Sequence, residues 1–401
     1  MMRLSTNQIF RQGVSAILDQ QSKLAQTQQQ ISSGKRINKP SDDPAGAARV
    51  LDIKQQIATV EQYGRNADLA KTQLALEENA LVGVENILQR VRELAIQANN
   101  DSLNVDNRQA IASEMRTRLD ELLALANSRD ANGDYLFAGF QVNNQPFAFT
   151  GGTLTYGGDQ GQVFAQIGPG VQVPTNDAGA AVFQLIDTGN GVYTALQNPA
   201  NTGTGVVGAA SLNGAFVPDT YTITFTQAAP TDPVTYQVTG VASGVVASGN
   251  YVAGEAIVFN GVSLTIDGEP ADSDTFTVAP AATQDVFTTV DALANALTAH
   301  PDSPTGRAHL HNEVNQQLNN LDRALEHIVG VRTQIGTRLN NIDSQTQVNE
   351  DFILQMREAQ SNVEDIDFAE AISRLNLQTV ALQAAQQSYI QVQGLSLFNL
   401  L

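Results

Sequence analysis

The chain of 401 residues carries 22 lysines and arginines against 41 aspartates and glutamates, a net charge of −19. An acidic chain repels nucleic-acid phosphates and anionic membranes, so neither is expected as a partner. The absence of cysteine excludes disulfides and thiolate sites. The sequence contains no run of 18 apolar residues, so no transmembrane helix is predicted. The first 12 residues lack the apolar run of a cleavable signal peptide.

Charge and turn residues divide the chain into three regions. Every basic residue lies at or before Arg129 or at or after Arg307, and the stretch between them holds 15 acidic residues. The same stretch holds 23 of the 31 glycines and 11 of the 13 prolines, whereas the flanks are rich in Gln, Ala, Leu and Asn. This pattern predicts long helices at both ends of the chain and a turn-rich insert between them.

The first flank predicts three helices. A helix from about residue 5 to 32 is expected to end at Gly34, a C-cap glycine. Asp43 followed by Pro44 predicts an N-cap with proline at the first helical position, so a second helix should start there and reach about residue 97. A third helix, from about 104 to 127, can fold back on the second as an antiparallel hairpin.

The insert shows the alternation of β-strands. Tyr221, Ile223 and Phe225 alternate with threonines, which predicts a strand with one apolar face. Asn260-Gly261 lies between two strand patterns and predicts a hairpin turn. A further hairpin is expected from residues 156–159 with 163–167, and the glycine-rich residues 199–215 are expected to form a loop.

After the insert, one long helix is expected from about residue 305 to 358, followed by a break near 361–365 and a C-terminal helix. The predicted fold is therefore α+β and multidomain: a long antiparallel helical bundle or coiled-coil rod built from both chain ends, with an inserted all-β domain. The expected segments are 1–44, 45–138 (rod), 139–300 (β insert), 301–361 (rod) and 362–401.

Both ends of the chain carry a heptad stripe. Every seventh residue from Phe10 and from Phe368 is large and apolar, whereas the row expected four residues further on is mostly polar, with Gln21, Gln28 and Gln386. A single helix of this kind buries too little apolar surface to offset the conformational entropy that it loses on folding. We therefore expect these segments to be disordered in the monomer and to become ordered on assembly. The alternative is an ordinary intramolecular helix pair. The expected assembly interface is Phe10, Val14, Ile17, Leu24, Ile31, Phe368, Ile372, Leu375, Leu382, Tyr389, Leu397, Phe398 and Leu400.

Three groups of polar residues invite a chemical interpretation, and each has a simpler one. His309, His311 and His327 lack the cysteines or carboxylates that would complete a metal shell, so solvated helix residues are preferred. Asp42 and Asp43 are better explained by helix capping and the helix dipole than by acid–base catalysis. The run Asp272-Ser273-Asp274, near Asp267 and Glu269, lacks the glycine and terminal glutamate of an EF-hand loop, which favours a solvated acidic turn over a weak Ca²⁺ site.

No Ser/His/Asp arrangement, phosphate-binding loop or dinucleotide fingerprint is present in the sequence. We therefore expect no catalytic residues, no cofactor and no metal, and the chain is not expected to be an enzyme.

Several motifs occur in an order that resembles the bacterial flagellin family. Ile31-Ser32-Ser33-Gly34-Lys35-Arg36-Ile37-Asn38 is similar to its N-terminal signature, and the following Lys39-Pro40-Ser41-Asp42-Asp43-Pro44-Ala45-Gly46 resembles the form found in hook-associated members. The segment Tyr135-Leu136-Phe137-Ala138-Gly139-Phe140 also resembles these hook-associated members. Asp365-Ile366-Asp367-Phe368-Ala369-Glu370-Ala371 and residues 397–401 resemble the family's C-terminal region. The resemblance covers about residues 1–145 and 305–401.

The resemblance implies a structural, hook-associated subunit of the flagellum. It would be exported unfolded through the flagellar type III apparatus with a cytoplasmic chaperone, and would lie outside the cell. It would assemble with its own copies as a ring at the hook tip, between the first hook-associated protein and flagellin. Two alternatives remain: flagellin itself, and an adhesive or glycan-binding surface protein that carries the insert on a flagellin-like rod.

Overall fold

The computed structural model describes residues 6–229 and 231–397, which form two compact units. The first unit joins the two ends of the chain, Met1–Arg65 with Ser344–Leu401. The second unit, Asn66–Asp343, contains the whole insert together with the helical segments that flank it.

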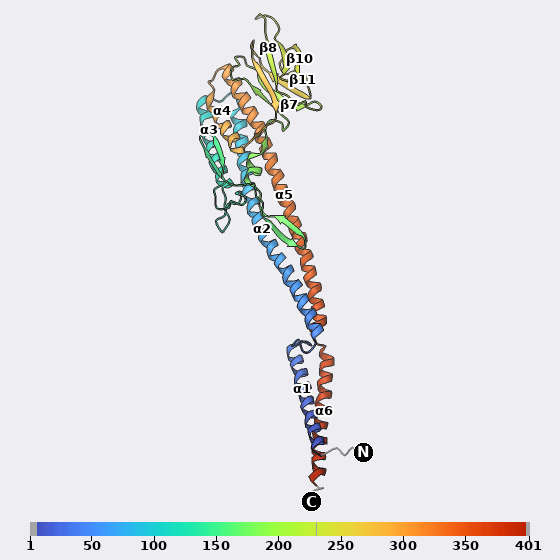
Figure 1. The fold of residues 1–401 in the computed structure, drawn as a ribbon. Helices are drawn as coiled ribbons and strands as arrows, with labels where there is room; N and C mark the ends of the chain where they lie inside the picture. Colours follow the sequence, from blue (N-terminus) through green and yellow to red (C-terminus); the bar gives the residue numbers. More distant parts are fainter. Residues whose placement is uncertain (1–5, 230, 398–401) are drawn as a thin grey trace. The chain divides into compact units, whose positions relative to one another are not determined.

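The first unit is helical. Helices α1 (Thr6–Ser33) and α6 (Phe368–Leu397) lie side by side, and the start of α2 (Pro44–Ala98) and the end of α5 (Pro304–Glu364) complete the unit (Figure 1). The expected caps are confirmed: Gly34 has a φ of 71°, and the Asp43 Oδ1 accepts the Gly46 N–H at 2.9 Å. The C-terminal break is also confirmed, although α5 runs six residues beyond its expected end.

The second unit has a helical core. Helix α3 (Val105–Ala126) folds back after α2, and α4 (Val286–Ala299) packs on α3 (Figure 1). The sequence analysis did not anticipate α4, which lies in the expected β insert. Asp285 caps it by accepting the Thr288 N–H at 2.7 Å, and Phe287 and Leu293 are fully buried in the shared helical core. Within the described residues no helix is both long and apolar enough to cross a membrane.

The insert builds a two-sheet β domain with its own core. A five-stranded antiparallel sheet has the order β10-β9-β8-β13-β6, and a three-stranded antiparallel sheet has the order β11-β12-β7. Side chains of both sheets share one buried cluster, which includes Ile223, Leu264 and Phe276. The strands are β6 (Tyr193–Gln197), β7 (Val206–Leu212), β8 (Tyr221–Thr226), β9 (Thr235–Gly240), β10 (Gly244–Asn250), β11 (Ala256–Phe259), β12 (Val262–Asp267) and β13 (Thr275–Pro280).

Small elements connect this domain to the helices. They are the hairpins β1 (Phe147–Thr150) with β2 (Thr153–Tyr156) and β3 (Phe164–Gly168) with β4 (Val171–Pro174), the π-helix η1 (Ala180–Gln184), and the pair β5 (Ile186–Asp187) with β14 (Thr283–Gln284).

Two strand expectations are confirmed. In β8 the residues Tyr221, Ile223 and Phe225 are fully buried and alternate with threonines. Asn260 and Gly261, with φ of 39° and 84°, form the turn between β11 and β12, as expected for an Asn-Gly hairpin.

Two other expectations are wrong. Residues 206–212 form strand β7 instead of a loop, because small side chains suit a crowded sheet: a Cβ on Gly208 would lie 2.4 Å from the Thr265 Oγ1. Residues 156–159 and 163–167 do not pair with each other. Tyr156 pairs with Phe147 across a Gly151-Gly152 turn, and β3 pairs with β4 across a turn with Gly170 at a φ of 73°.

The two-sheet core predicts a large effect for one truncation. Ile223→Ala should lower the free energy of unfolding of the β domain by about 2–5 kcal/mol, because it leaves a cavity at a fully buried site. Thr222→Ala, on the opposite face of β8, is the matched control and should cost much less. Urea unfolding followed by circular dichroism measures both. Equal costs for the two variants would contradict a core shared between the sheets.

Candidate assembly surface at the chain ends

Apart from Phe368, which is 52% exposed, the first heptad row of each terminal helix packs inside the chain. Phe10, Ile17, Leu24 and Ile31 of α1 are half-buried, as are Leu375, Leu382 and Tyr389 of α6. The rings of Phe10 and Tyr389 meet edge to face with their centroids 5.8 Å apart. The structure therefore brings most of the expected interface residues together as an intramolecular seam between α1 and α6.

The second row of the seam differs from the expectation. The inward residues lie three positions after the first row, not four, and Gln21, Gln28 and Gln386 are exposed. Both spacings occur in a heptad, and the side on which the partner helix packs decides between them. The residues of the actual row are small or polar: Gly13, Gln20 and Thr27 in α1, and Ala371, Gln378 and Ala385 in α6.

This second row suits a close helix pair. A Cβ on Gly13 would lie 2.9 Å from the Tyr389 ring, so glycine leaves room for the aromatic side chain. The Gln20 Nε2 donates to the Gln378 carbonyl at 3.2 Å. The two terminal helices are thus joined by one apolar row and one row of small or hydrogen-bonding residues.

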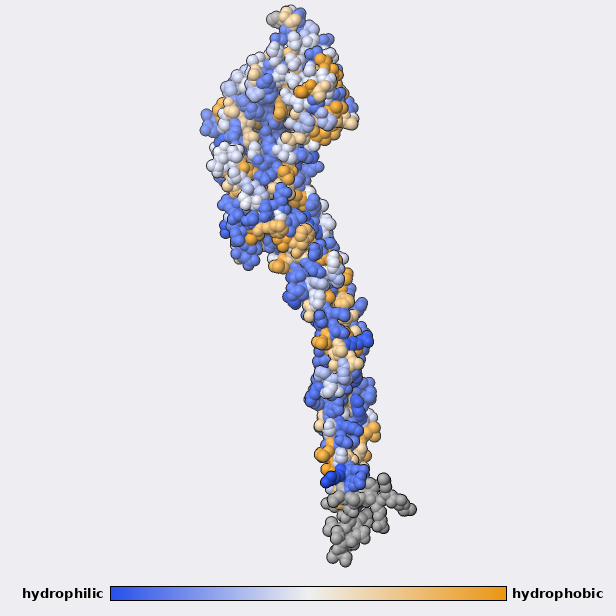
Figure 2. Space-filling model, in the orientation of Figure 1, coloured by the Kyte–Doolittle hydropathy of each residue, from blue (hydrophilic) through white to orange (hydrophobic). Residues whose placement is uncertain are grey.

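Large apolar side chains remain exposed on the same two helices. Leu18 is 58% exposed and Leu377 70%, although each lies on an ordered helix. Figure 2 shows apolar side chains scattered among polar ones along these helices on the face in view. We call the exposed set the outer residues: Val14, Leu18, Phe368, Ile372, Leu377, Val380 and Ile390.

The outer residues overlap with the expected interface only in part. Val14, Phe368 and Ile372 were expected, whereas Leu18, Leu377, Val380 and Ile390 were missed because they lie off the heptad rows. The signal that could have found them is a large apolar residue among polar neighbours on the far side of an amphipathic helix. Of the remaining expected residues, Leu397 ends α6, and Phe398 and Leu400 lie outside the described residues.

A buried carboxylate ties the segment after α1 to the end of α5. Glu364 accepts hydrogen bonds from the Lys35 Nζ at 2.7 Å, the Lys54 Nζ at 3.2 Å and the Gln360 Nε2 at 2.6 Å. The backbone adds bonds from the Arg36 N–H to the Glu364 carbonyl and from the Ile366 N–H to the Gly34 carbonyl. We call this cluster the Glu364 clasp.

Opposing effects set the charge of Glu364. Burial by itself raises the pKa of this carboxyl, but the hydrogen bonds from Lys35, Gln360 and Lys54 outweigh it and lower the pKa to about 2. The clasp therefore keeps a buried negative charge paired at neutral pH. Sequence reasoning missed Glu364, since its partners are more than 300 residues away along the chain, apart from Gln360.

The expected capping role of Asp43 is confirmed, and Asp42 has a related role. The Asp42 Oδ2 accepts the N–H groups of Asn38 and Lys39 at 3.1 and 3.0 Å. Asp42 thus shapes the turn before α2 by direct hydrogen bonds, and both carboxylates are engaged in holding backbone.

The solvated interpretation is wrong for the three histidines and for Asp274, whereas Asp267, Glu269, Asp272 and Ser273 are exposed as expected. His309, His311 and His327 are half-buried, and their rings contact acceptors on other elements. Asp274 is only 3% exposed, and its carboxylate accepts the N–H groups of Thr202, Gly203 and Ala271. In the part of the chain that the structure describes, no three His, Asp or Glu residues are grouped in a way that could hold a metal ion.

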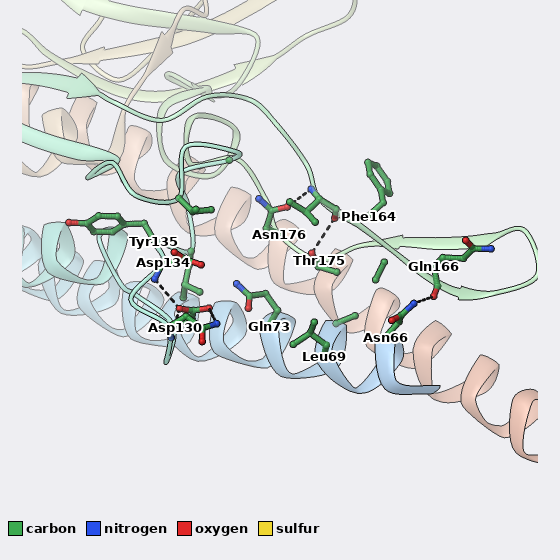
Figure 3. Close-up of a pocket in the computed structure, with 17 residues that line it drawn as sticks. Asn66, Leu69, Gln73, Asp130, Asp134, Tyr135, Phe164, Gln166, Thr175 and Asn176 are labelled. Atoms are coloured by element: carbon green, nitrogen blue, oxygen red, sulfur yellow. Dashed lines mark hydrogen bonds between the residues drawn. The ribbon is translucent and has the colours of Figure 1, made fainter. Parts of the chain in front are cut away.

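The second unit contains a hollow of about 410 Å³ beside α2, between the loop at residues 130–142 and strand β3 (Figure 3). Leu69 and Phe164 form exposed apolar parts of its wall. Its polar groups serve the local fold: the Asn66 Nδ2 donates to the Gln166 carbonyl, and the Asp130 Oδ1 accepts N–H groups of its own loop. These contacts describe a structural hollow and not a catalytic one.

Comparison with known proteins links both chain ends to one family. The model of the bacterial flagellin N-terminal helical region matches residues 4–142, and that of the C-terminal helical region matches residues 318–401. The chain is 25% identical to flagellar hook-associated protein 3 of Salmonella typhimurium over 400 residues, which cover 100% of this chain and 99% of the relative.

A solved structure extends this similarity to the fold. The flagellar junction protein FlgL from Legionella pneumophila is 34% identical, with a TM-score of 0.72 over 79% of this chain and 100% of that chain. A flagellin of Clostridium tyrobutyricum is 36% identical, but over only 28% of this chain and 30% of its own length. The similarity to hook-associated protein 3 thus extends over the insert, whereas the similarity to this flagellin does not span the chain.

The Glu364 clasp predicts a loss of stability in acid. Because the pKa of Glu364 is lower in the folded chain than the usual 4.5, its contribution is present above about pH 4.5 and is lost as the pH falls towards about 2. Glu364→Gln should cost about 1–3 kcal/mol at pH 7 and should flatten this pH dependence. Glu358→Gln, an exposed position on the same helix, is the control. Thermal unfolding between pH 7 and pH 3 measures both, and parallel pH profiles for the two variants would contradict the clasp.

The seam predicts different effects for two leucines of α1. Leu24→Ala should destabilise the α1–α6 pair by about 1–2 kcal/mol, because Leu24 is half-buried in the first row. Leu18→Ala removes an exposed side chain and should leave the pair unchanged. Hydrogen exchange of the α1 and α6 amides in the free subunit measures the difference. Equal protection in the two variants would show that the seam row is misassigned.

Proposed function

We propose that this chain, which belongs to the family of flagellar hook-associated protein 3 (FlgL), is a structural subunit that joins the hook of the bacterial flagellum to the flagellin filament. The observation that carries the proposal is the set of outer residues, which leaves large apolar side chains exposed on the paired chain ends. Exposed apolar surface of this kind is typical of protein interfaces.

The outer residues support assembly with further copies of the chain. An apolar side chain that passes from water into an interface contributes about 1.5–3 kcal/mol when it is fully buried. Seven such residues on one helix pair therefore offer substantial binding energy, and the first row is already satisfied within the chain. If one subunit contacts the next through two different surfaces, the contact repeats around an axis, and it closes into a ring when the rotation between neighbours closes.

Sequence similarity at the chain ends supports flagellin as one partner of such a ring. Flagellin shares the terminal helical regions with this chain, so it offers comparable helices for packing. We propose that flagellin contacts one side of the ring and the first hook-associated protein contacts the other. In this proposal, residues 1–44 and 362–401 assemble, residues 45–138 and 301–361 form the rod, and residues 139–300 form the projecting insert.

The route out of the cell is part of the same proposal. We infer export as an unfolded chain through the flagellar type III apparatus with a cytoplasmic chaperone. A chain without cysteine cannot be trapped by disulfides during threading. The terminal helices share only one apolar row, so separating them costs little. We propose that in the free subunit the pair exchanges between the closed seam and disordered ends, and that neighbouring subunits fix the closed form by covering the outer residues.

Substitution of outer residues should separate assembly from folding. The double variant Leu377→Ser with Val380→Ser should leave the thermal unfolding of the free subunit unchanged and should reduce the number of filaments per cell at least about tenfold. Val245→Ser, an exposed valine on β10, is the matched control and should assemble normally. Electron microscopy of a complemented deletion strain counts the filaments.

The deletion strain also tests the family role directly. It should keep its hooks, lose its filaments and release flagellin into the medium. Normal filaments on the double variant would contradict the outer-residue interface, whereas normal filaments on the deletion strain would contradict the junction role as a whole.

A further inference from the structure

The start of α5 ties the β domain to the helices through side chains of one short stretch. His309 contacts Gln197, at the end of β6, and Asn201; Asn312 contacts the backbone at the start of β7. His311, two residues after His309, contacts the turn between α2 and α3. All of these residues belong to the second unit.

The orientation of the Asn312 amide is set by backbone groups. Its Oδ1 accepts the Val207 N–H at 2.7 Å, and its Nδ2 donates to the carbonyls of Gly205 and Ala308, both at 2.9 Å. Reversing the amide would place oxygen against oxygen. The Gln197 Nε2 donates to the His309 carbonyl at 3.2 Å, so the side chain of Gln197 presents its Oε1 at this point, 2.9 Å from the Asn312 Nδ2.

His309 therefore lies between two acceptors. Its Nδ1 is 2.9 Å from the Gln197 Oε1, and its Nε2 is 3.0 Å from the carbonyl oxygen of Asn201. A neutral imidazole has one N–H and one lone pair, so it satisfies one of these contacts and opposes the other. Only the imidazolium, with two N–H groups, donates to both oxygens.

His311 has the same arrangement. Its Nδ1 is 2.6 Å from the Asn99 Oδ1, and its Nε2 is 2.8 Å from the Asp101 Oδ1. The Asn99 Nδ2 donates to the Asn315 Oδ1, and the Asn315 Nδ2 lies 3.5 Å from the Val207 carbonyl, so this chain of amides also ends at backbone. Again both ring nitrogens face acceptors.

The charges around the two rings include both signs. His309 stacks on His300 with the ring centroids 5.6 Å apart, and His300 lies 2.9 Å from Glu313. Beside His311, Asp101 lies 4.0 Å from Arg307, which pairs with Asp302 at 2.7 Å. Asp302 is also 3.9 Å from Arg108. The surroundings thus hold three carboxylates against two guanidinium groups, an excess of one negative charge beside the two rings.

We propose that protonation of His309 locks the β domain onto the start of α5, that protonation of His311 locks the start of α5 onto the turn between α2 and α3, and that loss of these protons loosens both attachments. Histidine is the side chain whose charge ordinarily changes between pH 5 and 8, so the lock responds to the fluid that surrounds the protein. Each neutral ring leaves one nitrogen lone pair facing an oxygen. The contacts of Gln197, Asn201, Asn99 and Asp101 then weaken together.

The protonation state of the rings tests the proposal directly in the intact chain. The sequence has four histidines, so ¹⁵N-histidine labelling gives four ring spectra, which single His→Gln variants assign. His327 is the internal reference, because the contact of its ring is a single one, from the Nε2 to the Ala181 carbonyl. We expect both ring N–H signals of His309 and His311 under conditions where the Val207 amide is protected from exchange, and their loss together with that protection as the pH rises. Two ring N–H signals that persist while the protection is lost, or a single one while the protection is retained, would overturn the proposal.

A second measurement tests whether the attachment of the β domain loosens. The Val207 amide donates to Asn312, so its hydrogen exchange, corrected for the intrinsic pH dependence, reports the attachment. Between pH 6 and pH 8 its protection should fall about tenfold in the wild-type chain and should not change in a His309→Gln, His311→Gln double variant. An equal change in both proteins, or no change in the wild type, would contradict the lock. If the double variant failed to fold, the ring spectra of the wild type would still decide.

Discussion

The pairing of the N-terminal and C-terminal helices is the constraint on which the rest of the structure depends. Residues more than 350 apart meet in the α1–α6 seam, and the Glu364 clasp closes the loop at its end. A single apolar row with a second row of small or polar residues holds two helices together without covering their outer surfaces. That balance leaves Leu18, Leu377 and their neighbours free for a second set of contacts. If the second row were also large and apolar, the helix pair would be more stable within one subunit. The subunit would then gain less from polymerisation.

The helical part of the second unit and the β domain have separate hydrophobic cores. The helical core of the second unit takes side chains from α2 to α5, and the two-sheet β domain has a cluster of its own. A substitution in the β core therefore has no direct route to the α1–α6 seam, since distant sites without shared partners act nearly independently.

The sequence predicted those features that local patterns encode. Long periodic stretches, Gly34 and the Asp43-Pro44 pair gave the helices within a few residues, and Asn260-Gly261 gave the main hairpin. Features that depend on distant partners were not predictable. Strand β7 is too poor in β-branched and aromatic residues to stand out, and it exists because β12 pairs with it. The seam row was placed one residue away because only the neighbouring helix decides between a spacing of three and four. Glu364 looks like any surface glutamate until Lys35 and Lys54 lie beside it.

The histidines at the start of α5 are a further case in which the role of a residue depends on partners that are distant in the sequence. In the sequence His309 and His311 are two polar residues on a helix, and their spacing argues against a shared ligand. In the fold, each ring is held by acceptors whose orientation can be traced back to backbone carbonyls and N–H groups. Because a backbone carbonyl cannot act as a donor, we propose that the ring supplies both N–H groups. The protonation that we propose for these rings therefore follows from the backbone groups at which the hydrogen-bond networks end. Any side chains that kept the orientation of Gln197 and Asn99 would require the same N–H groups on the rings.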